Sequence, residues 1–251
     1  YADKYLFTFS FRADGSSRFG KDNKFGYFPS ASFGWRLSEE DFISQLNIFS
    51  NLKPRISYGI TGNQSIGNYN SLSTFSLAGS ATLGDKSRTA IAQARIPNPG
   101  LRWEAQKQYN IGLDIGVLKG RISGNFDYFI KRTSDMLYNV PVPTSTGFSS
   151  FLDNIGEIES KGLEFSIRTA NVVEGDFNWN TTLNFSHIKN EVIDLGPVER
   201  ITRAPLDYQT TSNIIKEGEP INSYYGHEVI GIWQEGEDPS NSAQPNAEPG
   251  Y

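Results

Sequence analysis

Residues 177–188 read FNWNTTLNFSHI, and along them apolar and polar side chains alternate almost without interruption. Because successive side chains of a β-strand point to opposite faces of its sheet, this stretch predicts a strand with two unlike faces. One face carries Phe177, Trp179, Thr181, Leu183 and Phe185. The other face carries Asn178, Asn180, Thr182, Asn184 and Ser186. The aromatic-rich face has to be covered, and the two possible covers are a packed protein core and lipid.

The same alternation recurs along most of the chain and predicts an all-β fold. We expect an antiparallel meander of about seven or eight strands, with strands at about 4–13, 25–36, 53–61, 103–118, 121–132, 154–169 and 177–188. Lys119 and Gly120 indicate a tight turn between two of them. One short helix is expected near 38–43, because Ser38 is a good N-cap residue and acidic residues follow it.

The composition supports a β fold and excludes several classes of protein. The chain has 251 residues, with 24 glycines, 13% aromatic residues and only 37% hydrophobic residues, which favours short strands and polar loops. Its 23 basic and 28 acidic residues are mixed along the chain, so no nucleic-acid footprint is expected. The absence of cysteine excludes disulfides and thiolate metal sites. No apolar run reaches the length of about 18 residues that suggests a spanning helix, but a spanning strand needs only about 9–11 residues.

The predicted connections alternate between long and short. Long loops are expected at 62–102, with a possible short strand near 72–77, at 133–153 and at 189–222, and short links at 119–120 and 171–176. Long loops on one rim and short turns on the other are typical of an outer-membrane β-barrel.

The composition of the two faces favours lipid over a protein core. The polar face is rich in Asn, Ser, Gly and Asp, which suit a water-lined lumen, whereas the outer face of a soluble sandwich usually carries Lys and Glu. No charged residue interrupts the apolar face within 5–11, 109–117 or 177–185, where a Lys or Arg would cost about 2–4 kcal/mol at the bilayer midplane. A soluble carbohydrate-binding β-sandwich remains the alternative, and a passive outer-membrane barrel or adhesin is a third hypothesis.

Six motifs, in order along the chain, resemble one protein family. They are FRADGSSRFG (11–20), FPSASFGWRLSEEDF (28–42), RISYGITGNQSIGNY (55–69), NPGLRWEAQKQYNIGLDIG (98–116), DYFIKRTSDMLYNVPVP (127–143) and NIGEIESKGLEFSI (154–167). The segment GEPINSYYGHEVIGIWQ (218–234) fits the same pattern. Together they resemble the barrel region of the SusC/RagA family of TonB-linked outer-membrane proteins, and the resemblance covers nearly the whole chain.

The resemblance implies a transport function. Family members are nutrient importers in the outer membrane of Bacteroidetes-type bacteria, with an N-terminal plug, a segment that contacts TonB and a plugged barrel of about 22 strands. A SusD-like surface lipoprotein would cap the barrel and present a glycan or a peptide. Outer-membrane lipid would cover the barrel, and TonB would supply energy through the N-terminal part. No enzymatic activity and no cofactor are expected.

The resemblance also implies that this chain is part of a longer protein. It begins with Tyr1 and shows no plug, no TonB-contacting segment and no final barrel strand of the family, so a fragment or processed piece is expected. Residues 1–188 would be consecutive barrel strands, and residues 189–251 a long extracellular excursion with a possible strand at 223–233. In isolation such a sheet would have two open edges and would tend to aggregate.

Two groups of residues are candidates for contact with a substrate or a partner. On the polar face, the residues expected to line the lumen and meet the plug or a substrate are Asn110, Asp114, Asn125, Asp127, Glu164, Arg168, Asn178, Asn180 and Asn184. In the loops, the candidates for ligand or partner contact are Asn63, Asn68, Tyr69, Phe75, Tyr138, Phe148 and Phe151. Packing within the loops is an equally good explanation for the loop aromatics, and turn formation is the favoured role of residues 59–68.

No motif predicts catalysis or metal binding. His187 and His227 are the only histidines, and neither belongs to a set of three or more ligands with suitable spacing. Glu157 and Glu159 would share one face of a strand, and we interpret them as wall residues rather than as the paired carboxylates of a glycosidase.

Overall fold

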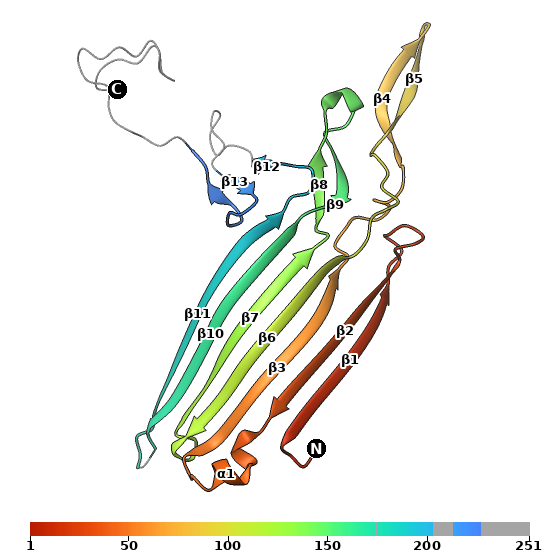
Figure 1. The fold of residues 1–251 in the computed structure, drawn as a ribbon. Coiled ribbons are helices and arrows are strands. Elements are labelled where there is room, and N and C mark those ends of the chain that lie inside the picture. Colours follow the sequence, from red (N-terminus) through yellow and green to blue (C-terminus); the bar gives the residue numbers. More distant parts are fainter. Residues whose placement is uncertain (174, 203–212, 227–251) are drawn as a thin grey trace, which may run out of the picture.

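The computed structural model describes residues 1–173, 175–202 and 213–226. Seven long strands make one antiparallel sheet in the spatial order β1-β2-β3-β6-β7-β10-β11 (Figure 1). Their bounds are β1 Tyr5–Gly15, β2 Phe25–Trp35, β3 Phe49–Asn63, β6 Glu104–Val117, β7 Ile122–Ser134, β10 Glu157–Val172 and β11 Trp179–Asp194. Each long strand pairs with the next one along the chain, which confirms the predicted all-β antiparallel meander.

The two ends of the sheet differ in the length of their connections (Figure 1). At one end, here called the link end, β2 joins β3 through η1 (Leu37–Glu39) and α1 (Asp41–Ser44), and β6 joins β7 through η2 (Leu118–Gly120). Lys119 and Gly120 have φ of 55° and 86°, the backbone of the predicted tight turn. The other end, here called the loop end, carries the long connections 64–103 between β3 and β6 and 135–156 between β7 and β10, together with the shorter connection 16–24 between β1 and β2. The short helix predicted near 38–43 is confirmed by α1 and by η1 just before it.

The helix is capped differently from the prediction. Ser38 lies buried in η1, and the N-cap of α1 is Glu40, whose side chain makes no cap hydrogen bond. The Glu40 carboxylate instead accepts hydrogen bonds from Trp35 Nε1 at 3.1 Å, Lys4 Nζ at 3.0 Å and Tyr5 Oη at 2.9 Å. These three donors lower the pKa of Glu40 below its ordinary value, with the bond from Trp35 contributing most. The carboxylate thus joins the start of β1 to the end of β2.

The long connections contain more secondary structure than the sequence pattern indicated, although β4 begins at Phe75, within the possible strand predicted near 72–77. Three further small sheets consist of β4 (Phe75–Leu83) with β5 (Lys86–Gln93), β8 (Leu137–Pro141) with β9 (Ser150–Asn154), and β12 (Arg200–Thr202) with β13 (Asn213–Lys216) and β14 (Ser223–Tyr224). A 3-10 turn, η3 (Thr144–Thr146), joins β8 to β9. In the region of the predicted strand at 223–233, only β14 is strand, and residues 227–233 lie outside the described part.

Several long strands extend beyond the predicted bounds because they pair along their whole length. β3 begins at Phe49, where a connector was expected, and pairs with β6 from Phe49 opposite Val117 to Asn63 opposite Glu104. β11 begins at Trp179, after Asn178, and continues through Asp194. The strand predicted at 154–169 is also shifted. Asn154 belongs to β9, and β10 begins only at Glu157 and continues to Val172. In these ends apolar and polar residues do not alternate regularly, so alternation did not reveal them.

Pro29 limits the pairing of β2, as its position suggests. β2 pairs with β1 along its entire length, but with β3 only from Ser30 to Gly34. Proline has no N–H to donate to a second neighbour. The two strands separate beyond this point toward the loop end (Figure 1).

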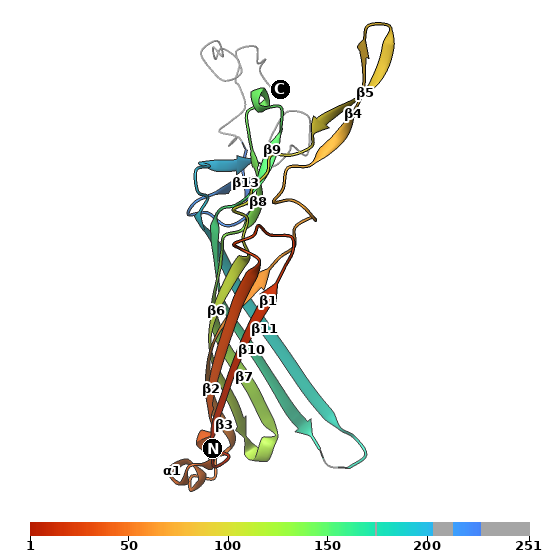
Figure 2. The ribbon, with the colours of Figure 1, turned by 90° about the vertical axis from the view of Figure 1, so that its right-hand side faces the viewer.

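Hydrophobic side chains are buried at the loop end and not on the sheet. In the described part, Phe7, Phe9 and Phe11 of β1 are 73%, 64% and 58% exposed. The most buried hydrophobic residues belong to the loops and to the loop end of β11, and they include Phe19, Leu101 and Val192. Viewed from the side, the sheet is twisted, and β10 and β11 diverge from β1 and β2 toward the link end (Figure 2). No helix in the described ranges is long and apolar enough to cross a membrane.

Candidate functional site

The register of the seven strands makes each face of the sheet continuous. On the apolar face, one row of opposing residues consists of Phe7, Phe33, Ile56, Ile111, Tyr128, Leu163 and His187. On the polar face, a neighbouring row consists of Leu6, Gly34, Arg55, Gly112, Asp127, Glu164 and Ser186. The alternation first visible in residues 177–188 therefore extends across the whole sheet, although individual positions such as Leu6 depart from it.

An ion-pair cluster lies at the centre of the polar face, on β3, β6 and β7. Arg55 Nε lies 3.0 Å from Asp114 Oδ1, and Arg55 Nη2 lies 3.1 Å from both carboxylate oxygens of Asp127. Lys53 Nζ lies 2.8 Å from Asp114 Oδ2. Asn125 donates to Asp127 Oδ2 at 3.2 Å. These five residues are here called the Arg55 cluster, and their two positive and two negative charges neutralise one another.

Gly112 makes the Arg55 cluster possible. It lies directly between Arg55 and Asp127 in the register. A Cβ at this position would lie 2.5 Å from Asp127 Oδ1 and 2.8 Å from Arg55 Cζ. Any side chain would therefore displace the guanidinium from the carboxylate. The alternation placed Arg55 on the polar face, but only the register shows that it crosses Gly112 to reach Asp127.

The other predicted residues of the polar face are not gathered into this cluster. Glu164 lies directly opposite Asp127 and is exposed. Asn184 accepts a hydrogen bond from Ser166 Oγ at 2.7 Å. Asn110 is half-buried on β6. Arg168 on β10, Asn180 on β11 and Asn178 just before β11 are exposed. The structure thus brings Asp114, Asn125 and Asp127 together and leaves the rest apart.

Shallow hollows run along the polar face. One is lined mainly by small polar residues of β1, β2, β3 and β6, including Thr8, Ser30, Ser32, Ser57, Gln106 and Gln108. Another lies between β7, β10 and β11 and is lined by Asn125, Glu164, Ser166, Asn184 and Ser186, together with Phe165 and Phe185. Both hollows offer hydrogen-bond donors and acceptors, beside some apolar surface, to a ligand or a covering segment.

The bases of the long loops pack together in a small hydrophobic core. Phe19, Ile66 and Leu101 come from three separate loop stretches and are 2%, 7% and 0% exposed. Trp103 covers them, with its ring centroid 5.2 Å from that of Phe19, and its Nε1 donates to the carbonyl of Lys24 at 3.3 Å. Phe19, Ile66, Leu101 and Trp103 are here called the loop-base core.

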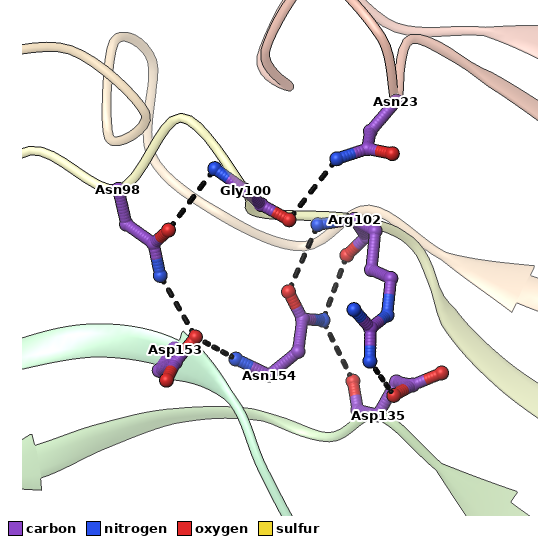
Figure 3. A network of polar contacts seen from close by, with 7 residues as sticks. All are labelled: Asn23, Asn98, Gly100, Arg102, Asp135, Asp153 and Asn154. Atoms are coloured by element: carbon purple, nitrogen blue, oxygen red, sulfur yellow. Dashed lines mark hydrogen bonds and ion pairs between the residues drawn. The ribbon is translucent and has the colours of Figure 1, made fainter.

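A polar network joins the same loops beside the loop-base core (Figure 3). The side-chain oxygen of Asn154 accepts from the backbone N–H of Arg102 at 2.8 Å, and its amide donates to the carbonyls of Arg102 and Asp135, both at 2.8 Å. Asn98 donates to Asp153 Oδ1 at 2.8 Å, and Asn23 donates to the carbonyl of Gly100 at 3.0 Å. The segment 98–102 therefore holds the β1–β2, β3–β6 and β7–β10 connections to one another.

The predicted loop residues divide between packing and exposure. Asn63 forms a local turn, since its Oδ1 accepts from the N–H of Ser65 at 2.9 Å, and its amide donates to Glu104 at 3.2 Å. Tyr138 packs on a second core of Val192, Leu195 and Ile201. Phe148 and Phe151 are half-buried, whereas Asn68, Tyr69 and Phe75 are exposed, with Tyr69 at 66% and Phe75 at 70%.

The candidate catalytic residues are engaged in other interactions or stand alone. Glu159 is held by Arg132 Nε at 2.8 Å and Lys161 Nζ at 2.5 Å, and Glu157 lies 3.4 Å from Arg132 Nη1. His187 lies within β11 rather than at its end and is exposed; His227 falls outside the described residues. No group of three or more potential metal ligands occurs in the ranges that the structure describes.

A long antiparallel sheet with an exposed apolar face, a polar opposite face and unequal connections defines a class of protein, the transmembrane β-barrel. Comparison with known proteins agrees. Residues 1–229 match the family model described as "TonB dependent receptor-like, beta-barrel". The chain belongs to this TonB-dependent receptor barrel family.

Individual relatives lead to the same family. The chain is 42% identical over 246 residues to TonB-dependent receptor P3 of Formosa agariphila, covering 97% of this chain and 24% of that protein. It is 35% identical over 240 residues to TonB-dependent receptor SusC of Bacteroides thetaiotaomicron, covering 91% of this chain and 24% of that protein. The chain thus spans about a quarter of the length of these relatives, and neither has the name of an enzyme.

Solved structures show the same fold. The RagAB peptide importer in its "closed-closed" state superposes with a TM-score of 0.80 at 30% identity, covering 97% of this chain and 26% of that chain. A structure of the RagAB peptide transporter gives a TM-score of 0.78 at 31% identity, covering 88% of this chain and 23% of that chain. The resemblance to the SusC/RagA family is therefore confirmed.

Proposed function

We propose that this chain is a wall segment of a TonB-dependent outer-membrane importer that takes up a glycan or a peptide together with a SusD-like surface lipoprotein. The observation that carries the proposal is the pair of unlike sheet faces. An aromatic and aliphatic face without a protein cover needs lipid, and a polar face with a neutralised ion cluster suits the interior of a barrel. In the described part no second sheet packs on the first, so a β-sandwich is not supported.

The polar face is proposed to meet the plug and, during transport, the substrate. The Arg55 cluster is internally neutralised, so it would fix the wall rather than bind a charged ligand. The better candidates for contact are the exposed members Glu164, Arg168, Asn178, Asn180 and Asn184. Glu164 and Arg168 make no ion pair with any described residue, and the three asparagines are uncharged. Their exposure on β10 and β11 supports this division of roles.

The loop end is proposed to face the cell exterior and the partner lipoprotein. Two relatives support this proposal: a structural neighbour of this chain is named the RagAB peptide importer, and a sequence relative is named SusC. Exposed Phe75, Leu77 and Ile91 on the β4–β5 hairpin, where Leu77 lies opposite Ile91, support a contact surface there together with exposed Tyr69, because contiguous exposed apolar patches mark interaction sites. Tyr138, Phe148 and Phe151 would support the loops from within.

Site-directed spin labelling tests the assignment of the two faces. Leu183 and Asn184 are adjacent on β11 and lie on opposite faces, so Leu183→Cys and Asn184→Cys form a matched pair in the complete receptor reconstituted in bilayers on a cysteine-free background. We expect the label at 183 to be the more accessible one to oxygen, which partitions into lipid. The label at 184 should be the more accessible one to a water-soluble nickel complex. Equal accessibility of both labels to the nickel complex would refute the membrane wall.

Uptake measurements test the transport function and separate the remaining alternatives. Cells that make the complete receptor should import a labelled oligosaccharide or oligopeptide, and should lose import when TonB or the partner lipoprotein is removed. Uptake that persists without TonB would indicate a passive barrel. Surface binding without uptake would indicate an adhesin.

A further inference from the structure

The apolar face ends at a basic residue on each of four neighbouring strands. Toward the loop end, the row of large apolar or aromatic residues gives way on the same face to a cation, as in Tyr109 then Lys107 on β6, Ile130 then Arg132 on β7, Leu163 then Lys161 on β10, and His187 then Lys189 on β11. All four cations are exposed. Lys107, Arg132, Lys161 and Lys189 are here called the basic belt.

The belt lies in two adjacent rows of the sheet. Lys107 lies directly opposite Arg132, and Lys161 lies directly opposite Lys189, one step nearer to the link end. The four cations therefore occupy two adjacent rows on the same face of four neighbouring strands.

The pairing of like charges in the belt is unfavourable without an anion. Two cations directly opposite one another in a sheet repel. Glu157 and Glu159 neutralise only part of the belt, since Glu159 binds Arg132 and Lys161, and Glu157 lies 3.4 Å from Arg132. Lys107 and Lys189 make no ion pair or side-chain hydrogen bond with any residue in the described ranges. Glu191 lies opposite Glu159 and one step nearer to the loop end than Lys189. The acidic residues therefore lie on the loop-end side of the belt, and the apolar residues lie on its link-end side.

The belt is local rather than a general property of the rim. On β1 and β2 the same face continues toward the loop end through Phe11, Tyr27 and Phe25, without a basic residue. On β3 the corresponding residues are Tyr58 and Ile60. The cations are thus confined to β6, β7, β10 and β11. This confinement indicates a site for a particular anionic group.

We propose that the basic belt binds the phosphate groups of a lipid whose acyl chains lie against the apolar face of β6 to β11. The inference rests on the proposed function, because it requires the apolar face to meet lipid. The continuity of the belt with exposed Ile111, Phe126 and Leu163 favours a phosphorylated lipid over a free anion, because a free anion would gain nothing from this surface. Each lysine near an anionic lipid headgroup contributes about 1 kcal/mol, or about fivefold in affinity.

Lipid titration of the complete receptor in detergent, followed by native mass spectrometry, tests the proposal. The probes are bisphosphorylated lipid A and the same lipid after enzymatic removal of its phosphates. The variant Lys107→Gln/Lys189→Gln removes the two cations without a protein partner, so the fold should persist, as checked by its unfolding temperature. We expect the double variant to bind the phosphorylated lipid about 25-fold more weakly and the phosphate-free lipid as the wild type does.

Lys131→Gln is the matched control, because Lys131 precedes Arg132 and lies on the opposite face of β7. It should leave lipid binding unchanged. Equal binding of both lipids by the wild type, an unchanged affinity in the double variant, or an equal loss in the control would each overturn the site. Displacement of lipid A by inorganic phosphate at equal concentration would show a simple anion site instead. The uptake assay is a separate readout, so a receptor that binds lipid as expected but does not import contradicts only the proposed function.

Discussion

Apolar side chains are exposed on the sheet and buried in the loop-base core. On β1, Phe7 and Phe9 are 73% and 64% exposed, whereas Leu101 and Phe19 in the loop-base core are 0% and 2% exposed. The sheet is held by ladder hydrogen bonds and by the Arg55 cluster on its polar face, while the loops are held by packing and by the Asn154 network. The comparison teaches that the loop end is built like a small soluble protein and the sheet is not.

The largest effect is expected from truncation in the loop-base core. Leu101→Ala should reduce the local stability of the loops by about 2–5 kcal/mol, because it leaves a cavity at a fully buried site. Hydrogen exchange in the complete receptor should show faster exchange in residues 16–24 and 98–103, with little change in the sheet. Leu77→Ala, at a side chain 75% exposed, is the control. Unchanged exchange in Leu101→Ala would contradict the core.

A charge on the apolar face should have the next largest effect, and only in a bilayer. Leu183 lies in the middle of the apolar stretch of β11, so Leu183→Arg should cost about 2–4 kcal/mol of stability in lipid vesicles, measured by denaturant unfolding. Asn184→Arg, one residue away on the polar face, should cost much less. An equal cost for both substitutions would show that the two faces are not distinguished by their surroundings.

Removal of the Asn154 side chain tests whether polar contacts or packing dominate at the loop end. Asn154→Ala leaves the N–H of Arg102 and two carbonyl groups without their partner, which should cost about 1–3 kcal/mol. Hydrogen exchange of the amide of Arg102 should report the loss. The control is Asn139→Ala, at an exposed residue of β8 without a side-chain hydrogen bond in the described part. A change as large as that of Leu101→Ala would reverse the expected order.

The smallest effect is expected at the link end and depends on pH. Because its pKa is lowered in the folded protein, Glu40 adds stability that is fully present above its ordinary pKa of 4.5 and is lost as pH falls through the lower folded value. Glu40→Gln should therefore weaken the junction of β1 and β2 at neutral pH and remove part of its acid sensitivity. Thermal unfolding between neutral pH and pH 3 is the measurement. Glu39→Gln, which loses only an exposed pair with Arg36, should keep that sensitivity.

The fold was predictable to the extent that its strands alternate. The long strands, their antiparallel order and the short helix followed from local patterns. Only the start of the β4–β5 hairpin was indicated, by the possible strand near 72–77, and the β8–β9 hairpin was not, because neither hairpin shows a sustained alternation of apolar and polar residues. The start of β3 at Phe49 was missed for a related reason: residues 49–52 have no clear alternation, and their strand conformation depends on pairing with β6.

The candidate site was predictable only by face. The sequence placed Asp114, Asn125 and Asp127 on the polar side, but gave no sign that Arg55 joins them. Arg55 is 59 residues from Asp114 and 72 from Asp127 along the chain. The same holds for the loop-base core, whose members come from the β1–β2 connection and from both ends of the β3–β6 connection.

By itself, the sequence determined which side chains share a face of each strand, because a period of two is a local property of extended backbone. The family followed from motifs of similar local range. Only the tertiary structure decided which charges meet across strands, that Gly112 leaves room for Arg55 to reach Asp127, and that four cations lie in two adjacent rows of the sheet. These depend on register, which is fixed by pairing between strands far apart in the chain.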